Sequence, residues 1–239
     1  MSLFQTTKLA CPACGKDVEF KVVHSVNIDR KPELREEIVA GTFQQENCGK
    51  CGEAFRLDPE FTYTDLARNQ WIAVFALDEL SRWQELEAEV QATFDVAYGS
   101  RAPAAARALG AGIRPRLVFG WPALCEKLAV AEHGLDDVEL ELMKVGLLRS
   151  LPRTPFTLEM ETELRFLDAH GGGDASRLSL GWFTGRWGSF LEGLEVPRDL
   201  YDGVVGDDSW KALRVKLSGR MFVDMARLIA VGSGAPVAE

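Results

Sequence analysis

The chain has 239 residues, of which 46% are hydrophobic and 26% are charged, and its formal net charge is −9. This composition is typical of a globular protein with one large core or two smaller ones. The longest clean apolar run, residues 71–77, is far shorter than the roughly 18 residues that a membrane-spanning helix needs, which argues against a membrane span. Acidic groups are spread along the whole chain, and this charge disfavours binding to the phosphates of nucleic acids.

Two Cys-x-x-Cys-Gly motifs are the clearest chemical signal in the sequence. Cys11 and Cys14 form the first pair, and Cys48 and Cys51 form the second. Four thiolates at such a spacing are typical ligands of a single Zn²⁺ in a tetrahedral site. The glycine that follows each pair suits a tight turn around a metal, because glycine adopts positive φ without a steric penalty. The sequence therefore predicts a metal site made of four cysteines.

Two alternatives to zinc use the same cysteines. Iron in a rubredoxin-like site accepts the same four sulfurs in the same geometry. Two independent redox dithiols are the other alternative, but no βαβ pattern surrounds either pair. Zinc is the favoured metal, and iron is the less favoured one. Four protein ligands leave no open position for water or substrate, so the expected metal is structural rather than catalytic.

The segments around these cysteines resemble the bacterial CpXC family, which takes its name from its cysteine pairs. Besides the two pairs, the resemblance rests on residues 25–29, 32–35 and 55–58. It extends from about Lys8 to Ala76 and, more loosely, from Arg116 to Arg149. The second pair lacks the proline that the first has, a departure that removes no ligand. The resemblance implies a zinc-ribbon-like domain and implies no particular activity.

Residues 1–99 are expected to form this zinc-ribbon-like β unit, with a helical insert and a following helix. Alternating apolar residues predict a strand over residues 18–28, and Asp29 is expected to cap a short helix over residues 32–41. Apolar residues then recur every three or four positions, which predicts a helix over residues 78–99. Further strands are expected at residues 43–48, 55–57, 61–64 and 70–76.

Residues 100–115, rich in alanine, glycine and proline, are expected to form a linker or a mobile loop. The following residues, 116–231, are predicted to be an α+β region that begins with a short strand at 116–119. Two helices follow, one opened by Pro122 and closed by Gly134, the other capped by Asp136. Their short connection predicts an antiparallel helical hairpin.

The last third of the chain has the pattern of a β-hairpin followed by a helix. Alternation over residues 156–166 predicts a strand whose outer face carries Glu163 and Arg165, and a second strand is expected over residues 178–182. No regular pattern covers residues 185–208. Residues 210–231 are predicted to be partly helical, and the tail, residues 232–239, is expected to be disordered.

Other residues with chemical potential have structural explanations. His24 could be an alternative ligand or a general base, but four cysteines already complete a tetrahedron. Cys125 lies on an apolar helical face, which indicates a buried, inert thiol rather than a nucleophile. The acidic stretch 132–137 is better explained by helix capping than by a cation site. A group of aromatic residues is expected mainly in the core, with a partner or ligand groove as the alternative: Trp182, Phe183, Trp187, Phe190, Tyr201, Trp210 and Phe222.

No P-loop, dinucleotide-binding, zinc-protease or nucleophile-elbow motif occurs in the sequence. Together with the closed metal site, this favours a non-catalytic, zinc-stabilised protein-interaction or adaptor module of a bacterial cell, which would act through a protein partner. The alternatives are a nucleic-acid-binding zinc ribbon and an enzyme whose site is not visible as a linear motif. No signal-peptide-like segment precedes Cys11, and the cysteine usage indicates reduced thiols, so the cytoplasm is the expected location.

Overall fold

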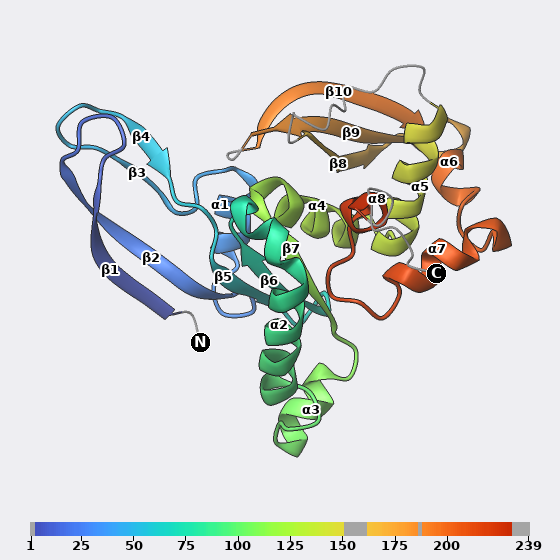
Figure 1. Ribbon diagram of the computed structural model, residues 1–239, viewed down its shortest axis with the longest axis horizontal. Helices are drawn as coiled ribbons and strands as arrows, with labels where there is room; N and C mark the ends of the chain where they lie inside the picture. Colours follow the sequence, from blue (N-terminus) through green and yellow to red (C-terminus); the bar gives the residue numbers. More distant parts are fainter. Residues whose placement is uncertain (1–2, 151–161, 186–187, 231–239) are drawn as a thin grey trace, which may run out of the picture. The chain divides into compact units, whose positions relative to one another are not determined.

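The computed structural model describes residues 3–150, 162–185 and 188–230 and confirms the predicted α+β class (Figure 1). The chain divides into two compact units, Met1–Trp121 and Pro122–Glu239. None of the helices in the described ranges combines the length and the apolar composition that crossing a lipid bilayer requires.

Unit 1 is built on a five-stranded mixed sheet with the strand order β1-β2-β5-β6-β7. The pairs β1–β2 and β5–β6 are antiparallel, and the pairs β2–β5 and β6–β7 are parallel. Strands β5 and β6, two of the three inner strands, are buried over most of their length, as expected for strands covered on both faces. The strands are β1 (Leu3–Ala10), β2 (Asp17–Asn27), β5 (Phe61–Asp65), β6 (Gln70–Phe75) and β7 (Arg114–Phe119).

Strand β2 confirms the predicted strand, but its buried residues differ from a simple alternation. Phe20, Val23 and Val26 are buried, whereas His24 is exposed. The pairing of β1 with β2 shifts by one residue at His24, since Leu3 lies opposite Ser25 and Phe4 lies opposite Val23. Such a bulge changes the face on which the following side chains lie.

Helix α1 (Glu33–Val39) forms the predicted insert between the two cysteine pairs. Its buried residues are the expected Leu34 and Ile38. The prediction that Asp29 caps this helix is wrong, since the carboxylate of Asp29 accepts a hydrogen bond from the backbone N–H of Leu66 at 3.1 Å. The short antiparallel strands β3 (Gln45–Asn47) and β4 (Ala54–Arg56) follow α1 and carry the second cysteine pair in their turn.

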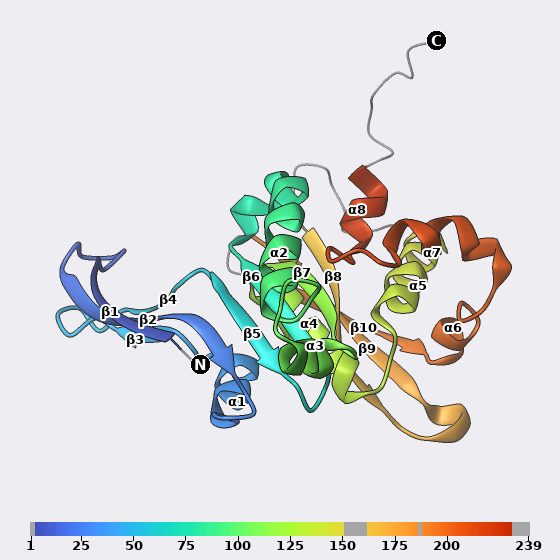
Figure 2. The same cartoon turned by 90° about the horizontal axis from the view of Figure 1, so that it is seen from below.

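The predicted helix over residues 78–99 is divided into a 3₁₀ segment, η1 (Leu77–Arg82), and helix α2 (Trp83–Ala97). Helix α2 lies against the sheet of unit 1 in both views (Figures 1 and 2), and the ring of Phe94 contacts that of Trp71 on β6 at a centroid distance of 5.3 Å. Residues 100–115 are not the irregular linker that the sequence predicts. They contain helix α3 (Ala104–Gly110), and Ala102 and Ile113 are buried.

An aromatic cluster packs the base of the β3–β4 hairpin onto the sheet of unit 1. The rings of Phe43, Phe61 and Trp121 contact one another at centroid distances of 5.6–6.2 Å. The guanidinium of Arg56 lies 3.5 Å from the centroid of the Trp121 ring and donates from Nε to the carbonyl of Phe43 at 2.9 Å. These contacts hold the hairpin through both apolar burial and a cation–π interaction.

Unit 2 contains the predicted helical hairpin, formed by α4 (Gly120–Glu132) and α5 (Asp137–Ser150). Gly134 follows the first helix with φ +62°, as the sequence predicts for a helix end. The carboxylate of Asp136 accepts the N–H groups of Val138 at 2.9 Å and Glu139 at 3.4 Å, which confirms the predicted cap.

A three-stranded antiparallel sheet, in the order β10-β9-β8, packs on these helices. Strands β8 (Thr162–His170) and β9 (Arg177–Thr184) form the predicted hairpin, with the short segment η2 (Gly173–Ala175) in its turn. The first part of the predicted strand, residues 156–161, lies outside the described residues. The prediction of irregular structure over 185–208 is wrong, because this segment contains strand β10 (Ser189–Pro197) and helix α6 (Asp199–Asp202).

The last described segment is helical in part, as predicted. It contains η3 (Asp208–Trp210), α7 (Lys211–Leu217) and α8 (Met225–Ala230), with Gly219 between the last two helices. Three residues of the predicted aromatic group, Trp182, Tyr201 and Phe222, are buried in the core. The others in the described ranges are Phe183 and Trp210, which are half-buried, and Phe190, which is 56% exposed. Trp187 and the predicted disordered tail, residues 232–239, lie outside the described residues.

Candidate metal centre

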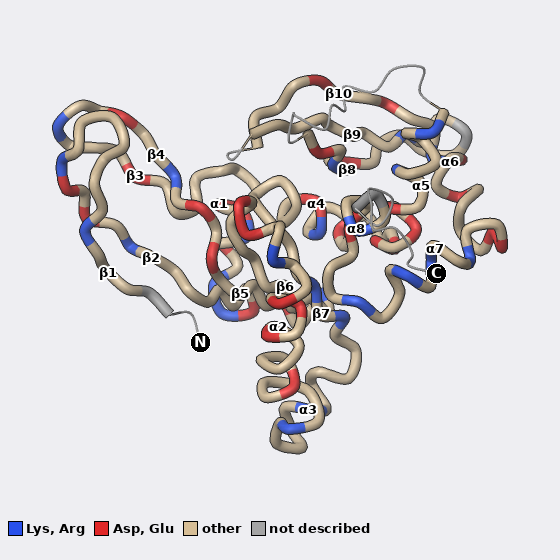
Figure 3. Tube along the Cα trace, viewed as in Figure 1, with Lys and Arg blue, Asp and Glu red and all other residues tan. Residues whose placement is uncertain are grey.

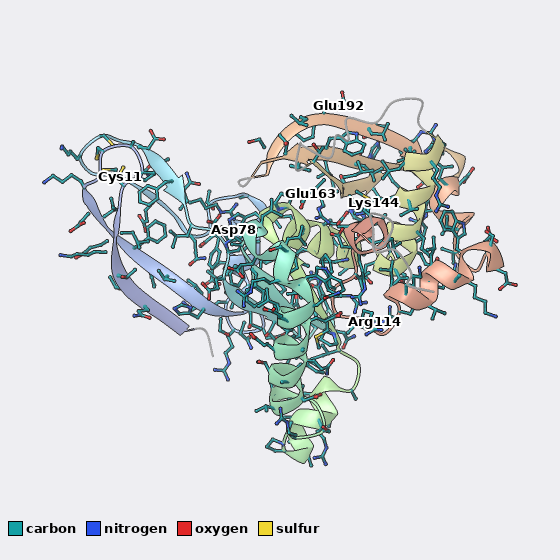
Figure 4. The ribbon with its side chains drawn as sticks, viewed as in Figure 1. Cys11, Asp78, Arg114, Lys144, Glu163 and Glu192 are labelled. Carbon is teal, nitrogen blue, oxygen red and sulfur yellow. The ribbon has the colours of Figure 1, made fainter. Side chains whose placement is uncertain are left out.

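The four predicted ligands come from the turns of two β-hairpins in unit 1. Cys11 and Cys14 lie in the turn between β1 and β2, and Cys48 and Cys51 lie in the turn between β3 and β4. The two turns meet at one end of the sheet, where Figure 1 shows the loops together and Figure 4 labels Cys11. The structure thus brings together four side chains that are 40 residues apart at their most distant.

The two turns have the same backbone geometry. In the first, the N–H of Cys11 donates to the carbonyl of Lys16 and the N–H of Gly15 donates to the carbonyl of Cys11. In the second, Cys48, Glu53 and Gly52 repeat this pattern with nearly equal distances of 2.8 Å. Gly15 and Gly52 both have positive φ, +68° and +76°, which explains why glycine follows each cysteine pair.

The positions of the sulfur atoms fit a tetrahedral metal site. The Sγ atoms of Cys11 and Cys51 are 3.7 Å apart, those of Cys14 and Cys48 are 3.6 Å apart, and all four lie within 4.8 Å of one another. Metal–sulfur bonds of about 2.3 Å place the corners of a tetrahedron about 3.8 Å apart. A disulfide needs about 2.05 Å between its sulfur atoms, and none of the five cysteines forms one. The cluster could therefore hold one metal ion.

The thiols of the second pair have unequal acidities. Backbone N–H groups of Cys51 and Lys50 point at the sulfur of Cys48 and lower its pKa to about 6. At Cys51 the backbone N–H of Glu53 lowers the pKa, but burial and the three neighbouring sulfurs raise it to about 12. Four thiols this close cannot all lose their protons without a cation, because each thiolate repels the next. This repulsion is what a divalent metal at the centre would relieve.

The four cysteines lie on an arm of unit 1, by which we mean strands β1 to β4 and the turns between β1 and β2 and between β3 and β4. Side chains that sequence reasoning missed support this arm. The rings of Phe20 on β2 and Phe55 on β4 contact each other at a centroid distance of 5.5 Å and join the two hairpins. The buried Gln44 accepts the N–H of Val23 through its side-chain oxygen at 2.9 Å and has φ +55°. The available signal for the ring contact was an aromatic residue shortly after each cysteine pair, Phe20 six positions after Cys14 and Phe55 four positions after Cys51. No local pattern identifies Gln44.

The other candidate residues lie outside the cluster. His24 is exposed on β2, and it is not among the grouped ligand atoms. Cys125 is half-buried on α4 in unit 2. The acidic stretch 132–137 contains the helix end and the helix cap described above, as its capping interpretation predicts.

Comparison with known proteins gives one match. The model of a family described as CpXC protein matches residues 9–144, more than half of the chain. No curated protein and no solved structure shows significant similarity to the chain. The match includes all four clustered cysteines, strands β2 to β4 and most of the α4–α5 hairpin, and it begins near the end of β1. The chain therefore belongs to the CpXC family.

Proposed function

We propose that the four cysteines hold one structural Zn²⁺ and that the protein is a non-catalytic protein-interaction module. The observation that carries the first part is the sulfur geometry, with separations of 3.6 and 3.7 Å across the two pairs. All four corners of such a site are sulfur atoms of the protein, which leaves no position for a substrate or an activated water. A bound Zn²⁺ would cross-link the two hairpin turns.

The arm has features that suit a binding element. Strand β1 is the outermost strand of the sheet, and the side chains of Gln5, Thr6 and Lys8 are exposed. Its described neighbour is β2 alone, so the backbone groups on its other edge can pair with a strand from another protein. Fixing both hairpin turns through one metal would keep this edge rigid and lower the entropic cost of binding.

The metal is tested by elemental analysis of the purified protein. We expect about one zinc atom per chain, no comparable amount of iron, and loss of the zinc upon denaturation with a chelator. Iron at the same stoichiometry would replace zinc in the proposal. A protein without either metal, prepared under reducing conditions with zinc supplied, would contradict it.

The binding role is tested by site-specific photo-crosslinking in cells. A photoreactive amino acid at Thr6, an exposed residue of the edge strand β1, should give one discrete protein adduct. The matched control carries the same photoreactive amino acid in place of Gln84, which is exposed on α2 of the same unit. It should not give that adduct. The Thr6 adduct should also disappear when Cys48 is replaced by serine. Equal crosslinking from both positions, or none from Thr6, would contradict a binding role for the arm.

A further inference from the structure

One edge of the three-stranded sheet in unit 2 is closed by charged side chains. The ammonium of Lys144 on α5 donates to the carbonyl of Leu164 at 3.1 Å, and the carboxylate of Glu126 on α4 accepts the N–H of Phe166 at 2.6 Å. Strand β8 pairs with β9 on its other side, so these two side chains bind backbone groups that a further strand would use. The edge of β8 is therefore closed from within the chain.

The same helical hairpin binds a second segment in the same way. Lys127 on α4 donates to the carbonyl of Val223 at 2.8 Å, and Glu141 on α5 accepts the N–H of Met225 at 2.8 Å. In both segments the lysine binds the carbonyl of one residue and the glutamate binds the N–H two residues later. Unit 2 thus uses charged side chains at two places to bind backbone groups that no strand pairs with.

Strand β10 forms the opposite edge of the sheet, and it has no such cover. It pairs with β9 alone, in the order β10-β9-β8. Among the residues that the structure describes, no hydrogen bond joins the outer side of β10 to another strand or to a side chain. Of its nine residues, all but Leu194 and Val196 are exposed. An open edge of this length can pair with an extended segment of another protein.

Apolar side chains lie beside this edge, on the face of the sheet that points away from the core. Leu180 and Trp182 of β9 belong to the core, so Gly181 and Phe183, which alternate with them, lie on the other face. Phe190 of β10 is paired with Phe183 and shares this face. The rings of Phe183 and Phe190 contact each other at a centroid distance of 5.6 Å.

A third apolar side chain, Leu167 of β8, meets these two rings over a glycine. A Cβ atom placed on Gly181 would lie 3.0 Å from side-chain carbons of Leu167, Phe183 and Phe190. We call these three residues the outer patch. Phe190 is 56% exposed and Leu167 is 40% exposed, and Leu191, which follows Phe190, is 44% exposed. A group of exposed large apolar side chains, unlike a single one, indicates an interaction site.

The open edge carries negative charge. Strand β10 contains Glu192 and Glu195 and no basic residue, and Figure 3 shows these acidic positions along it. Glu192, labelled in Figure 4, is exposed. Glu195 accepts a hydrogen bond from the hydroxyl of Ser179 at 2.5 Å and lies 3.4 Å from Nε2 of His170. A segment that pairs with β10 therefore meets two carboxylates next to the outer patch.

These charges indicate which kind of segment fits the edge. Opposite charges that face each other across a strand pair are stabilising, and like charges are destabilising. Pairing of β10 with the same strand of a second copy would bring together two glutamates from each strand and no cation. A segment with an apolar residue flanked by lysine or arginine complements both the charge of the edge and the outer patch.

We propose that β10 binds an extended segment of a partner protein by strand addition, and that this segment carries an apolar residue flanked by lysine or arginine. The backbone of the segment pairs with the open edge, and its apolar side chain packs beside Phe190 on the outer patch. Its cations offset the charges of Glu192 and Glu195. The site lies in unit 2 and uses neither the cysteines nor β1, so it does not depend on the metal or on the arm.

Two synthetic peptides test the proposal with the full-length protein. Both contain Val-Phe-Val, flanked on each side by two lysines in one peptide and by two glutamates in the other. Fluorescence anisotropy should show about tenfold or more tighter binding of the lysine peptide, because the glutamate peptide places like charges beside β10. Hydrogen exchange should show new protection in β10 when the lysine peptide is added, whereas β1 is the internal reference and should not change.

Variants at exposed positions locate the site. Replacing both Glu192 and Glu195 by lysine should reverse the order of the two peptides, and Phe190→Ser should weaken the binding of the lysine peptide. The control replaces Glu85 and Glu89, which are exposed on α2, by lysine. It changes the net charge of the protein by the same amount and should keep the native order of the two peptides.

Several results would overturn the proposal. Equal affinity of the two peptides for the native protein is one, and no binding of the lysine peptide at about 1 mM is another. The native order of affinities in the β10 double variant, or its reversal in the α2 control, would show that the peptides respond to net charge or bind elsewhere. Protection that appears in β1 and not in β10 would do the same, and this measurement needs no variant to fold.

Discussion

Replacing Cys48 by serine is expected to abolish metal binding and to unfold the arm of unit 1. Cys48 is buried, and its sulfur lies 3.6 Å from that of Cys14 in the other hairpin turn. A serine hydroxyl does not replace a thiolate ligand, so the remaining three sulfurs would lose most of the affinity for the ion. Because metal binding and folding are coupled, the loss should be several kcal/mol of the stability of unit 1. Metal content and hydrogen exchange of β1–β4 measure the two effects.

Cys125→Ser is the matched control for this prediction. Cys125 lies on α4, forms no disulfide and is outside the cysteine cluster. Its replacement should leave the metal content unchanged and the exchange of β1–β4 as in the native protein. Cys14→Ser, in contrast, should reproduce the effect of Cys48→Ser, since both supply one corner of the same site. Full metal retention by Cys48→Ser would refute the assignment of the four ligands.

Replacing Lys144 by methionine is expected to cost unit 2 about 3–5 kcal/mol, the usual loss when one partner of a buried ion pair is removed. The Lys144 side chain has no exposed surface, and its ammonium lies 2.9 Å from Glu126 and 2.8 Å from Glu141. Methionine has a similar length, so that the change removes the charge with little change in packing. Two carboxylates would then face each other in the interior, and the carbonyl of Leu164 would lose its donor.

Denaturant unfolding followed by hydrogen exchange in β8 and β9 measures this loss. Lys216→Met on α7, where the side chain is exposed, is the control and should change the free energy of unfolding by less than about 0.5 kcal/mol. Adding Glu141→Gln to Lys144→Met should recover part of the loss, because it removes one of the two unpaired carboxylates. Equal stability of Lys144→Met and the native protein would show that the buried ion pairs of Lys144 with Glu126 and Glu141 contribute little to folding.

The sequence identifies the candidate metal site well because its information is local. Each Cys-x-x-Cys-Gly motif defines its own turn, and the structure gives both turns the same hydrogen bonds. The buried residues Leu34 and Ile38 of α1 were predictable for the same reason, because their spacing of four residues places them on one face of the helix. The contact between the two turns is long-range in sequence. It could still be predicted, because four cysteines in two pairs are the usual ligand set of one metal ion.

The elements that the sequence analysis missed have weak local patterns. Residues 104–110 are helical because alanine favours a helix, but the flanking glycines and prolines suggest a loop. Strand β10 contains Gly193, and its pairing with β9 shifts between Phe190 and Glu192, which breaks the alternation. Arg165 was assigned to the outer face by alternation, yet it is buried because Glu126 and Asp224, 39 and 59 residues away, neutralise it. No short segment contains that information.

The family match ends at residue 144, and this boundary does not coincide with a boundary of the fold. Glu126, Lys127, Glu141 and Lys144 all fall within the match, whereas the backbone groups that they bind, at Leu164, Phe166, Val223 and Met225, all come after it. A fragment cut at the end of the match would lack the downstream backbone groups that these four side chains bind. Anyone expressing the family region by itself should therefore continue to the end of α8, since the shared helices depend on chain contributed from downstream.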